Sequence, residues 1–414
     1  MIPGPAREQP DSLDAASGRR AIAGFFLSGV LLSFVGAILP AWRYHLTSDF
    51  IAAGNYFFIL SAGILAGVHF GPRVLAHRST SSILSFGSAF AMAGFLFLAA
   101  VPPSFRPAWR IPGLFALGLA SGLLHSGLFR TISPMYRRSG ISTVNLAGAL
   151  FGLGCMVTSL LVASTFYVYT VSSILILLST IPGYFFILYM NSRFPSDSLV
   201  TDRPLRDVLH DLQTPTAILF TLLLFFQFGN EWSVAAWLPL FLIQRLGISP
   251  ETSLLLLSLY WLTLLVGRLT AHFVIPRMKR GWLLIGSAAC AVFGCLILSF
   301  TNNRFGAITA IVLLGLGFAV VYPLLVEKIG LRFPNYHPGL FNGISAVASI
   351  GGLLAPGTLG YFAEFWGIRV VMLLPLLGTF AVFVLALMIW LTAKLSGGAE
   401  IRIEEPAGKP TGLG

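Results

Sequence analysis

The sequence predicts an all-α polytopic membrane protein with twelve spanning helices in two six-helix halves, and three observations support this. Of the 414 residues, 56% are hydrophobic and 10% are charged, whereas soluble domains carry about 25% charged residues. Apolar runs of about 20 residues, long enough to cross a bilayer, recur along the whole chain. Short motifs of the first half also reappear, in the same order, in the second half.

Glycines, prolines and charged residues between the apolar runs divide the chain into spans. The twelve predicted spans are 21–44, 50–71, 81–101, 111–134, 142–166, 170–190, 214–243, 250–274, 282–301, 305–330, 338–362 and 368–393. The first run, after Arg19 and Arg20, is longer than a signal-peptide core of about 7–15 residues. We therefore interpret it as a membrane helix.

The longest polar connection divides the spans into two sets of six. The predicted parts are an N-terminal tail 1–20, a first bundle 21–190, a linker 191–213, a second bundle 214–394 and a C-terminal tail 395–414.

Positive charges between the spans orient the chain. If the N-terminus is cytoplasmic, the inner segments hold eighteen Lys and Arg residues and the outer segments six. Since cytoplasmic loops are enriched in these residues, we expect both termini in the cytoplasm, with a bacterial inner membrane favoured by the short loops. This placement accounts for the net charge of +11. We therefore expect the partner to be the lipid bilayer and not nucleic acid. We expect the monomer to function alone.

An internal repeat relates the two halves. The matching positions are Tyr56-Phe57, Gly63 and Pro72-Arg73 with Tyr260-Trp261, Gly267 and Pro276-Arg277 at an offset of 204, and Asn145 and Gly154 with Asn342 and Gly351 at an offset of 197. Each match is weak alone, but their common order predicts two related bundles.

The second half resembles the fucose and glucose/galactose permease branch of the major facilitator superfamily. The residues that carry the resemblance are Glu231 with Trp237, Gly267-Arg268, "GLGFAVVYPLL", "RFP" and "SIGGLLAPGTLG". The resemblance implies the major facilitator fold, sugar:proton symport and a substrate site between the halves near the bilayer midplane. Two departures weaken proton coupling of that kind: "GVHFGPRVLAHR" lacks the acid of the superfamily signature, and the first six spans contain no internal Asp or Glu.

Ionisable and amide groups within the spans are the candidate site residues, because a charge at bilayer depth costs at least about 2.5–3.5 kcal/mol and usually marks function or a buried pair. Glu231 lies in the seventh span with Gln227 and Asn230, and Arg268 lies in the eighth. Three roles are open for Glu231: an ion pair with Arg268 or another cation, a hydrogen bond to substrate, and proton carriage.

Trp261, Arg268 and His272 share one face of the eighth span. This stripe either packs against neighbouring helices or lines a cavity. We count Trp261 and Arg268 among the substrate-binding candidates and His272 among the coupling or gating candidates.

The offset of 197 sets His125 opposite Tyr322 and Arg130 opposite Glu327. In the family, the spans of His125 and Tyr322 line the central cavity, so both are binding candidates, although His125 could instead bond a neighbouring helix. Arg130 and Glu327 could latch an inner gate. Alternatively, Arg130 extends to lipid headgroups.

Together these features predict a secondary active transporter that works by alternating access on a small polar organic solute. A sugar fits the aromatic and amide side chains, and protons are a candidate coupling ion. An exporter of organic anions, drugs or metabolites, or a non-transporting membrane sensor, are the alternatives. No catalytic or metal-ligand motif is present, so we predict no enzyme, catalytic residue, cofactor or metal site.

Overall fold

The computed structural model describes residues 10–194, 214–275, 277–332 and 343–395, and these residues form helices and no strand. The helices of the first half are α1 (Pro10–Ile38), α2 (Tyr44–Thr47), α3 (Phe50–His77), α4 (Thr80–Ala99), the 3-10 helix η1 (Pro107–Arg110), α5 (Ile111–Thr165) and α6 (Val171–Met190). The helices of the second half are α8 (Pro215–Leu246), α9 (Pro250–Val274), α10 (Arg280–Phe300), α11 (Arg304–Arg332), α12 (Gly343–Trp366) and α13 (Val370–Leu395).

Twelve helical segments have the length that crosses a bilayer. Within the described residues, eleven are also apolar enough to be identified by composition, and α5 contributes two of them, Pro107–Ile132 and Thr143–Thr165. The twelfth is α12, which has 24 residues and packs against α3 and α8. The predicted all-α architecture of twelve membrane helices is confirmed.

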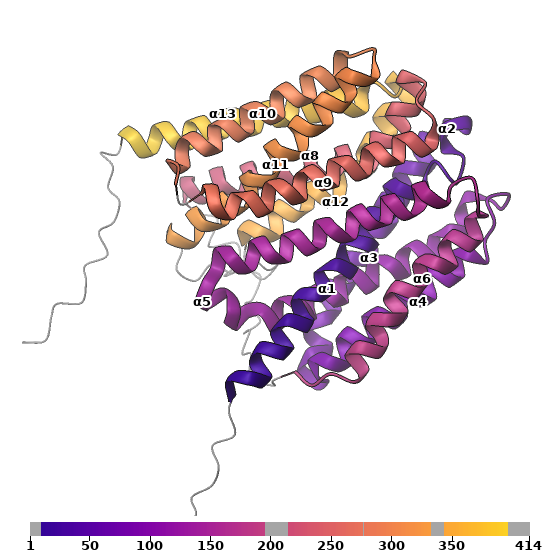
Figure 1. Cartoon of the computed structure of the whole chain (residues 1–414), viewed down its shortest axis with the longest axis horizontal. Coiled ribbons are helices and arrows are strands. Elements are labelled where there is room, and N and C mark those ends of the chain that lie inside the picture. Colours follow the sequence, from indigo (N-terminus) through magenta and orange to yellow (C-terminus); the bar gives the residue numbers. More distant parts are fainter. Residues whose placement is uncertain (1–9, 195–213, 276, 333–342, 396–414) are drawn as a thin grey trace, which may run out of the picture.

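The helices form two bundles (Figure 1). In the first, α5 packs against α1, α3 and α4, and α4 packs against α6. In the second, α8 packs against α12 and α13, and α11 packs against α9 and α10. The two bundles meet through α5 with α9, α3 with α12, and α1 with α8.

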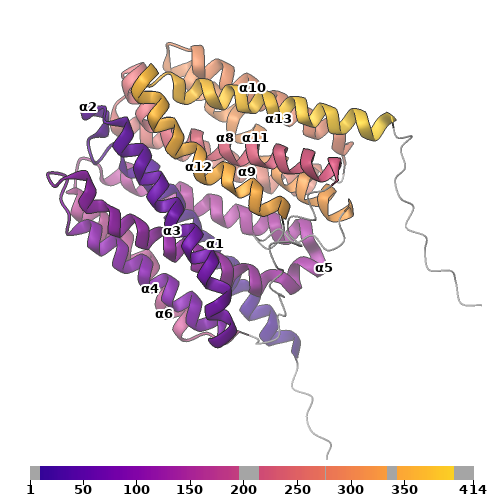
Figure 2. The same cartoon turned by 180° about the vertical axis from the view of Figure 1, so that it is seen from behind.

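Both ends of the described chain lie on one side of the molecule, which we call the terminal side; the opposite side carries α2 (Figures 1 and 2). Helix ends follow local chemistry. The side chains of Asp49 and Ser249 cap α3 and α9 by accepting hydrogen bonds from backbone N–H groups three residues on. Gly247 ends α8 with φ of 63°, a left-handed conformation that glycine adopts without strain.

Several boundaries differ from the sequence prediction. The first helix begins at Pro10 and ends at Ile38, so it both starts and ends earlier than the predicted span 21–44. Residues 44–47 form the separate helix α2. The connection expected between the fourth and fifth spans is helical throughout α5, and the ribbon reverses direction there (Figure 1). Most of the predicted linker, residues 195–213, lies outside the described residues, as do both ends of the chain, residues 1–9 and 396–414.

The buried apolar core is shared between the halves on the opposite side. One cluster joins α1, α3 and α5 to residues of α8 and α9 such as Val234, Trp237 and Leu257. A second cluster lies almost entirely within the second half, around Phe220, Leu325 and other residues toward the terminal side. The bundles are therefore packed together more continuously on the opposite side.

Candidate functional site

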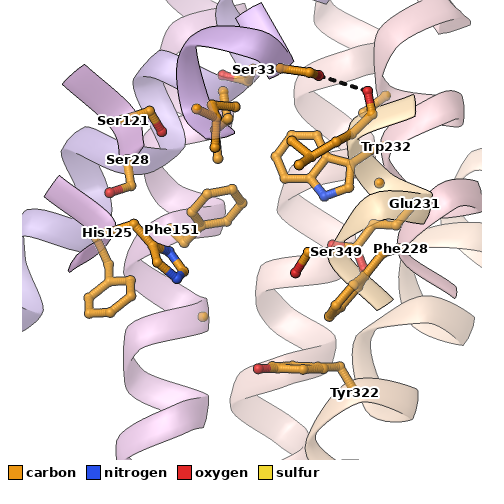
Figure 3. A pocket seen from close by; sticks show the side chains of 18 of the residues that line it. Ser28, Ser33, Ser121, His125, Phe151, Phe228, Glu231, Trp232, Tyr322 and Ser349 are labelled. Carbon is orange, nitrogen blue, oxygen red and sulfur yellow. Dashed lines mark hydrogen bonds between the residues drawn. The ribbon is translucent and has the colours of Figure 1, made fainter. Parts of the chain in front are cut away.

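A cavity of about 270 Å³ lies between the two bundles (Figure 3). The first half lines it from α1, α3 and α5, and the second half from α8, α9, α11 and α12. Its polar or charged lining residues are Ser28, Ser33, Ser61, Ser121, His125, Glu231, Trp232, Arg268, Tyr322 and Ser349. The rest of the wall is apolar and rich in phenylalanine.

The charged centre of the cavity is an ion pair between Glu231 of α8 and Arg268 of α9. The Arg268 Nη2 atom donates to the Glu231 Oε1 atom at 2.8 Å, and the two residues are only 7% and 4% exposed. Arg268 also reaches the other bundle, because its Nη1 atom donates to the Gly148 carbonyl of α5 at 3.1 Å. Of the three roles left open for Glu231 in the sequence analysis, the ion pair with Arg268 is present in the structure, whereas the role of Glu231 in transport stays a prediction.

The first half contributes His125 and four serines to the cavity. In Figure 3, Ser28, Ser121 and His125 lie across the cavity from Glu231 and Tyr322. His125 contacts the Phe129 ring at a centroid distance of 4.3 Å.

The serine hydroxyl hydrogens are mostly used within the protein. Ser33 and Ser349 donate to the carbonyls four residues earlier at 2.8 and 2.7 Å, and Ser61 donates to the Leu353 carbonyl of the other bundle at 2.7 Å. Because a hydroxyl has two lone pairs besides its one hydrogen, these serines offer acceptor sites to a ligand that carries O–H or N–H groups.

Aromatic rings form the second-half wall. Phe228 and Tyr322 lie with ring centroids 5.3 Å apart, and Trp232 contacts both Phe151 and Trp261 at 5.6 and 6.1 Å. Rings placed around a few polar groups are typical of sites for small organic ligands.

Three predicted binding residues do not line this cavity. Gln227 and Trp261 have no exposed surface, and Trp261 packs behind Trp232. Asn230 is directed toward α13, because a Cβ atom added at Gly378 would lie only 2.1 Å from its Oδ1 atom. Gln227, Asn230 and Trp261 therefore lie behind the cavity wall. The side chain of His272 lies outside the described part of the structure.

Glu327, proposed to latch an inner gate with Arg130, forms an ion pair with Arg280 at the start of α10. This pair lies within the second half. The latch between Arg130 and Glu327 stays a prediction.

The cavity is closed on the opposite side by contacts between the bundles, which we call the opposite-side seal. Trp237 of α8 packs across the interface against the Phe50 and Phe57 rings of α3 at about 6 Å. Its indole donates to the Pro356 carbonyl of α12, within the second bundle, at 2.9 Å. The Tyr361 hydroxyl of α12 donates to the Asn55 Oδ1 atom of α3 at 2.7 Å.

Small residues allow the backbones of the seal to approach closely. A Cβ atom added at Gly54 would lie 2.6 Å from the Gly357 carbonyl oxygen, and one added at Gly36 would lie 2.8 Å from the Ala235 carbonyl oxygen. Such distances leave no room for a side chain at Gly54 or Gly36, so the backbones of the two bundles are in close contact there.

The sequence interpretation missed the serines and the closing role of Trp237. Ser121 and His125 lie four residues apart and so share one helix face, which is a signal that could have identified Ser121. The other serines give no such signal, because serine is common in membrane helices and often bonds its own backbone.

Comparisons with known proteins agree with this architecture. Residues 133–349 match the family model described as the Major Facilitator Superfamily. The chain is 21% identical over 355 residues to the protein TsgA homolog of Buchnera aphidicola subsp. Baizongia pistaciae, covering 83% of this chain and 87% of that protein. It is 24% identical over 142 residues to the glucose/mannose transporter GlcP of Bacillus subtilis, covering 34% and 35% of the two chains.

Two solved structures share the fold. The E. coli fucose:proton symporter FucP superposes with a TM-score of 0.62 at 18% identity, over 91% of this chain and 98% of that chain. A D-xylose-proton symporter superposes with a TM-score of 0.73 at 13% identity, over 91% and 97%.

Proposed function

The chain belongs to the Major Facilitator Superfamily, and from this premise we propose that it carries a small hydroxylated solute of the sugar class across the membrane by alternating access. Its family and fold are those of transporters and not of enzymes. The membrane location follows from the same fold and from the apolar helices.

One observation carries the proposal: the same cavity is lined by both bundles and closed on the opposite side by contacts between them. A site at the interface of two repeats can be exposed to either side when the repeats rock against each other. Opening the opposite-side seal and closing the terminal side would then present the same residues to the other compartment.

The sugar class is supported by the wall of the cavity and by the relatives. Phe228, Trp232 and Tyr322 offer faces for the C–H surface of a pyranose, and the serines accept hydrogen bonds from hydroxyls. The glucose/mannose transporter GlcP, the fucose:proton symporter FucP and the D-xylose-proton symporter bear sugars in their names.

The orientation is a further part of the proposal. The excess of Lys and Arg in the segments on the terminal side supports a cytoplasmic location for that side. The structure would then show the inward-facing state of a monomer in a bacterial inner membrane.

Transport is tested with purified protein in liposomes. We expect saturable uptake of at least one of D-glucose, D-xylose, L-fucose and the corresponding sugar acids, and accumulation above the outside concentration when an inward proton gradient is imposed. Folded protein that takes up none of these solutes would contradict the proposal.

Alternating access is tested by locking the seal. With Asn55→Cys and Tyr361→Cys joined by a short bifunctional reagent that forms a disulfide with each thiol, uptake should fall to background and return after reduction. Each single cysteine variant, treated with the same reagent, should transport normally. Undiminished uptake by the cross-linked protein would show that the seal does not open during transport.

A further inference from the structure

The ion pair in the cavity is incompletely bonded. The Glu231 Oε2 atom and the Arg268 Nε atom are both buried and have no hydrogen-bond partner, although Glu231 Oε1 and both terminal nitrogens of Arg268 are engaged. A buried polar atom without a partner carries the full cost of its desolvation. Because both residues line the cavity, a ligand that enters it lies beside an ion pair that is not fully hydrogen-bonded, and a rearrangement of the pair would make its unsatisfied atoms available to the ligand.

The surroundings of Glu231 make it the carboxylate that can respond to protons. The titratable or charged neighbours on packed helices are Arg268 and Tyr260 on α9, Cys155 and His125 on α5, and Tyr322 on α11. The cavity residues of α1 and α12, and Val370–Leu391 of α13, contain no titratable side chain. Among the described lining residues, Glu231 is the only carboxylate.

The charge of the cavity limits what can be carried with a proton. When empty, Glu231 and Arg268 balance each other. A proton on Glu231 with a neutral sugar would leave Arg268 as an uncompensated buried cation, and a bound anion with Glu231 still ionised would leave a net negative charge. Both states are costly because removing one partner of a buried pair leaves a charge out of water. A monoanion and a proton together keep the cavity neutral.

We propose that the transported solute is a sugar acid whose carboxylate replaces that of Glu231 on Arg268, while one proton from water binds Glu231. This rests on the proposed function and names its substrate. The Glu231–Arg268 ion pair breaks, an O–H bond forms on Glu231, and a new ion pair forms between substrate and Arg268. On the other side, release of the substrate and of the proton to water restores the original pair.

The remaining cavity fits the body of such a solute. Ser33, Ser61 and Ser349 present acceptor oxygens, since their own hydrogens bond carbonyls. Hydroxyl groups of the solute supply the matching donors. The amide side chains of Gln227 and Asn230 do not line the cavity, so the arginine is the strongest available anchor.

The test uses matched neutral and acidic probes. D-glucuronate, D-galacturonate and D-gluconate are compared with D-glucose and D-galactose by calorimetry and by liposome uptake, with a trapped pH indicator. We expect at least one sugar acid to bind at least tenfold more tightly than its neutral counterpart. Its uptake should bring in about one proton per molecule and should not respond to an imposed membrane potential.

The two members of the pair should give opposite results. Glu231→Gln removes the internal competitor, so the sugar acid should bind at least tenfold more tightly and without pH dependence, while exchange persists and proton-driven accumulation is lost. Arg268→Gln should abolish sugar-acid binding. General damage to the cavity would weaken both variants alike, so this opposition excludes a purely structural role.

Matched controls are Glu364→Gln and Arg277→Gln, which change exposed residues away from the cavity. The double variant Glu231→Gln with Arg268→Gln should fold and show no preference for the acidic probes. Equal loss of all probes in both single variants, or equal binding of acidic and neutral probes, would overturn the proposal. If D-glucose, D-xylose or L-fucose is transported and every sugar acid is excluded, this inference fails alone; if no probe of either kind is transported, the proposed function fails.

Discussion

Two buried arginines, Arg268 in the cavity and Arg110 at the opposite-side end of the first bundle, show how neighbours decide what a buried cation does. Arg268 is 7% exposed and its charge is balanced by a carboxylate. Arg110 is 2% exposed, and no carboxylate among the described residues lies within ion-pairing distance of it.

Arg110 is instead surrounded by neutral groups. Its Nη1 atom donates to the hydroxyls of Tyr56 at 2.8 Å and Tyr44 at 3.3 Å, and its Nη2 atom donates to the Pro103 carbonyl at 3.1 Å. The guanidinium also lies 4.8 Å from the centre of the Trp42 ring. Burial, and then the hydrogen bond to Tyr56, raise the pKa of Tyr44 well above its ordinary value, so this phenol stays neutral.

The two arginines differ in whether their partners can be replaced: we call Arg268 exchangeable because its carboxylate partner can be replaced, and Arg110 fixed because its partners cannot. A solute carboxylate can replace the Glu231 carboxylate on Arg268 because the two are chemically alike and the cavity admits the solute. The partners of Arg110 belong to the backbone and to packed rings, and no lining residue of the cavity is among them. We therefore expect Arg110 to stabilise the first bundle and Arg268 to serve transport.

The largest effect should come from Arg110→Gln. The substitution removes three charge-assisted hydrogen bonds and a cation–π contact, partly offset because a cation no longer has to be buried. We expect the free energy of unfolding to fall by about 3 kcal/mol, measured by thermal unfolding in detergent. Uptake per folded molecule should be unchanged; a selective loss of uptake with normal stability would reverse the assignment.

Lysine at each position sharpens the contrast. Lysine keeps the charge but cannot reproduce the planar fork of donors or the stacking of guanidinium on a ring. Arg110→Lys should therefore lower the free energy of unfolding by about 2 kcal/mol. Arg268→Lys should keep the ion pair with Glu231 and leave stability nearly unchanged, while sugar-acid affinity falls about tenfold. Equal thermal stability of the two variants would show that both arginines are held in the same way.

Much of the fold could be predicted because each membrane helix corresponds to a long apolar run in the sequence. The reversal between the spans 111–134 and 142–166 was predicted, but the helical backbone of that connection was not predictable in the same way. The connection between these predicted spans, residues 135–141 ("MYRRSGI"), contains a glycine and two arginines, yet its backbone remains helical. The polarity of a segment indicates whether it is surrounded by water or by lipid, but it does not determine whether the backbone forms helical hydrogen bonds.

The candidate site was predictable only where a residue is rare. Glu231 and Arg268 stand out because charges are costly at bilayer depth. Asn230 is equally conspicuous in sequence, but the rotation of α8 directs it toward α13, and rotation depends on packing. Arg110 gives no such signal, since its tyrosine partners are 54 and 66 residues away in the sequence and only the tertiary fold brings them to it.

A smaller effect is expected from Tyr56→Phe, which tests the Arg110 region without removing its charge. The change deletes one hydroxyl. This hydroxyl accepts a hydrogen bond from Arg110 and donates one to the Pro107 carbonyl at 3.2 Å. We expect a loss of about 1 kcal/mol in the free energy of unfolding, with unchanged uptake. Tyr361→Phe, which deletes a hydroxyl of the opposite-side seal, is the matched control and should alter the rate of transport more than stability.

The smallest effect should come from Gly148→Ala beside Arg268. The added Cβ atom would lie 3.3 Å from the Arg268 Nη1 atom and 3.4 Å from its Cδ atom, so the side chain must shift by a few tenths of an ångström. Gly152→Ala, one turn further along α5, is the matched control because its Cβ atom would meet nothing closer than 3.8 Å. Both changes favour the helix similarly, by up to about 1 kcal/mol. We therefore expect equal thermal stability but a two- to threefold lower sugar-acid affinity in Gly148→Ala alone. If calorimetry finds the same affinity in both variants, the position of the guanidinium does not control binding, and the contrast between an exchangeable Arg268 and a fixed Arg110 loses its geometric basis.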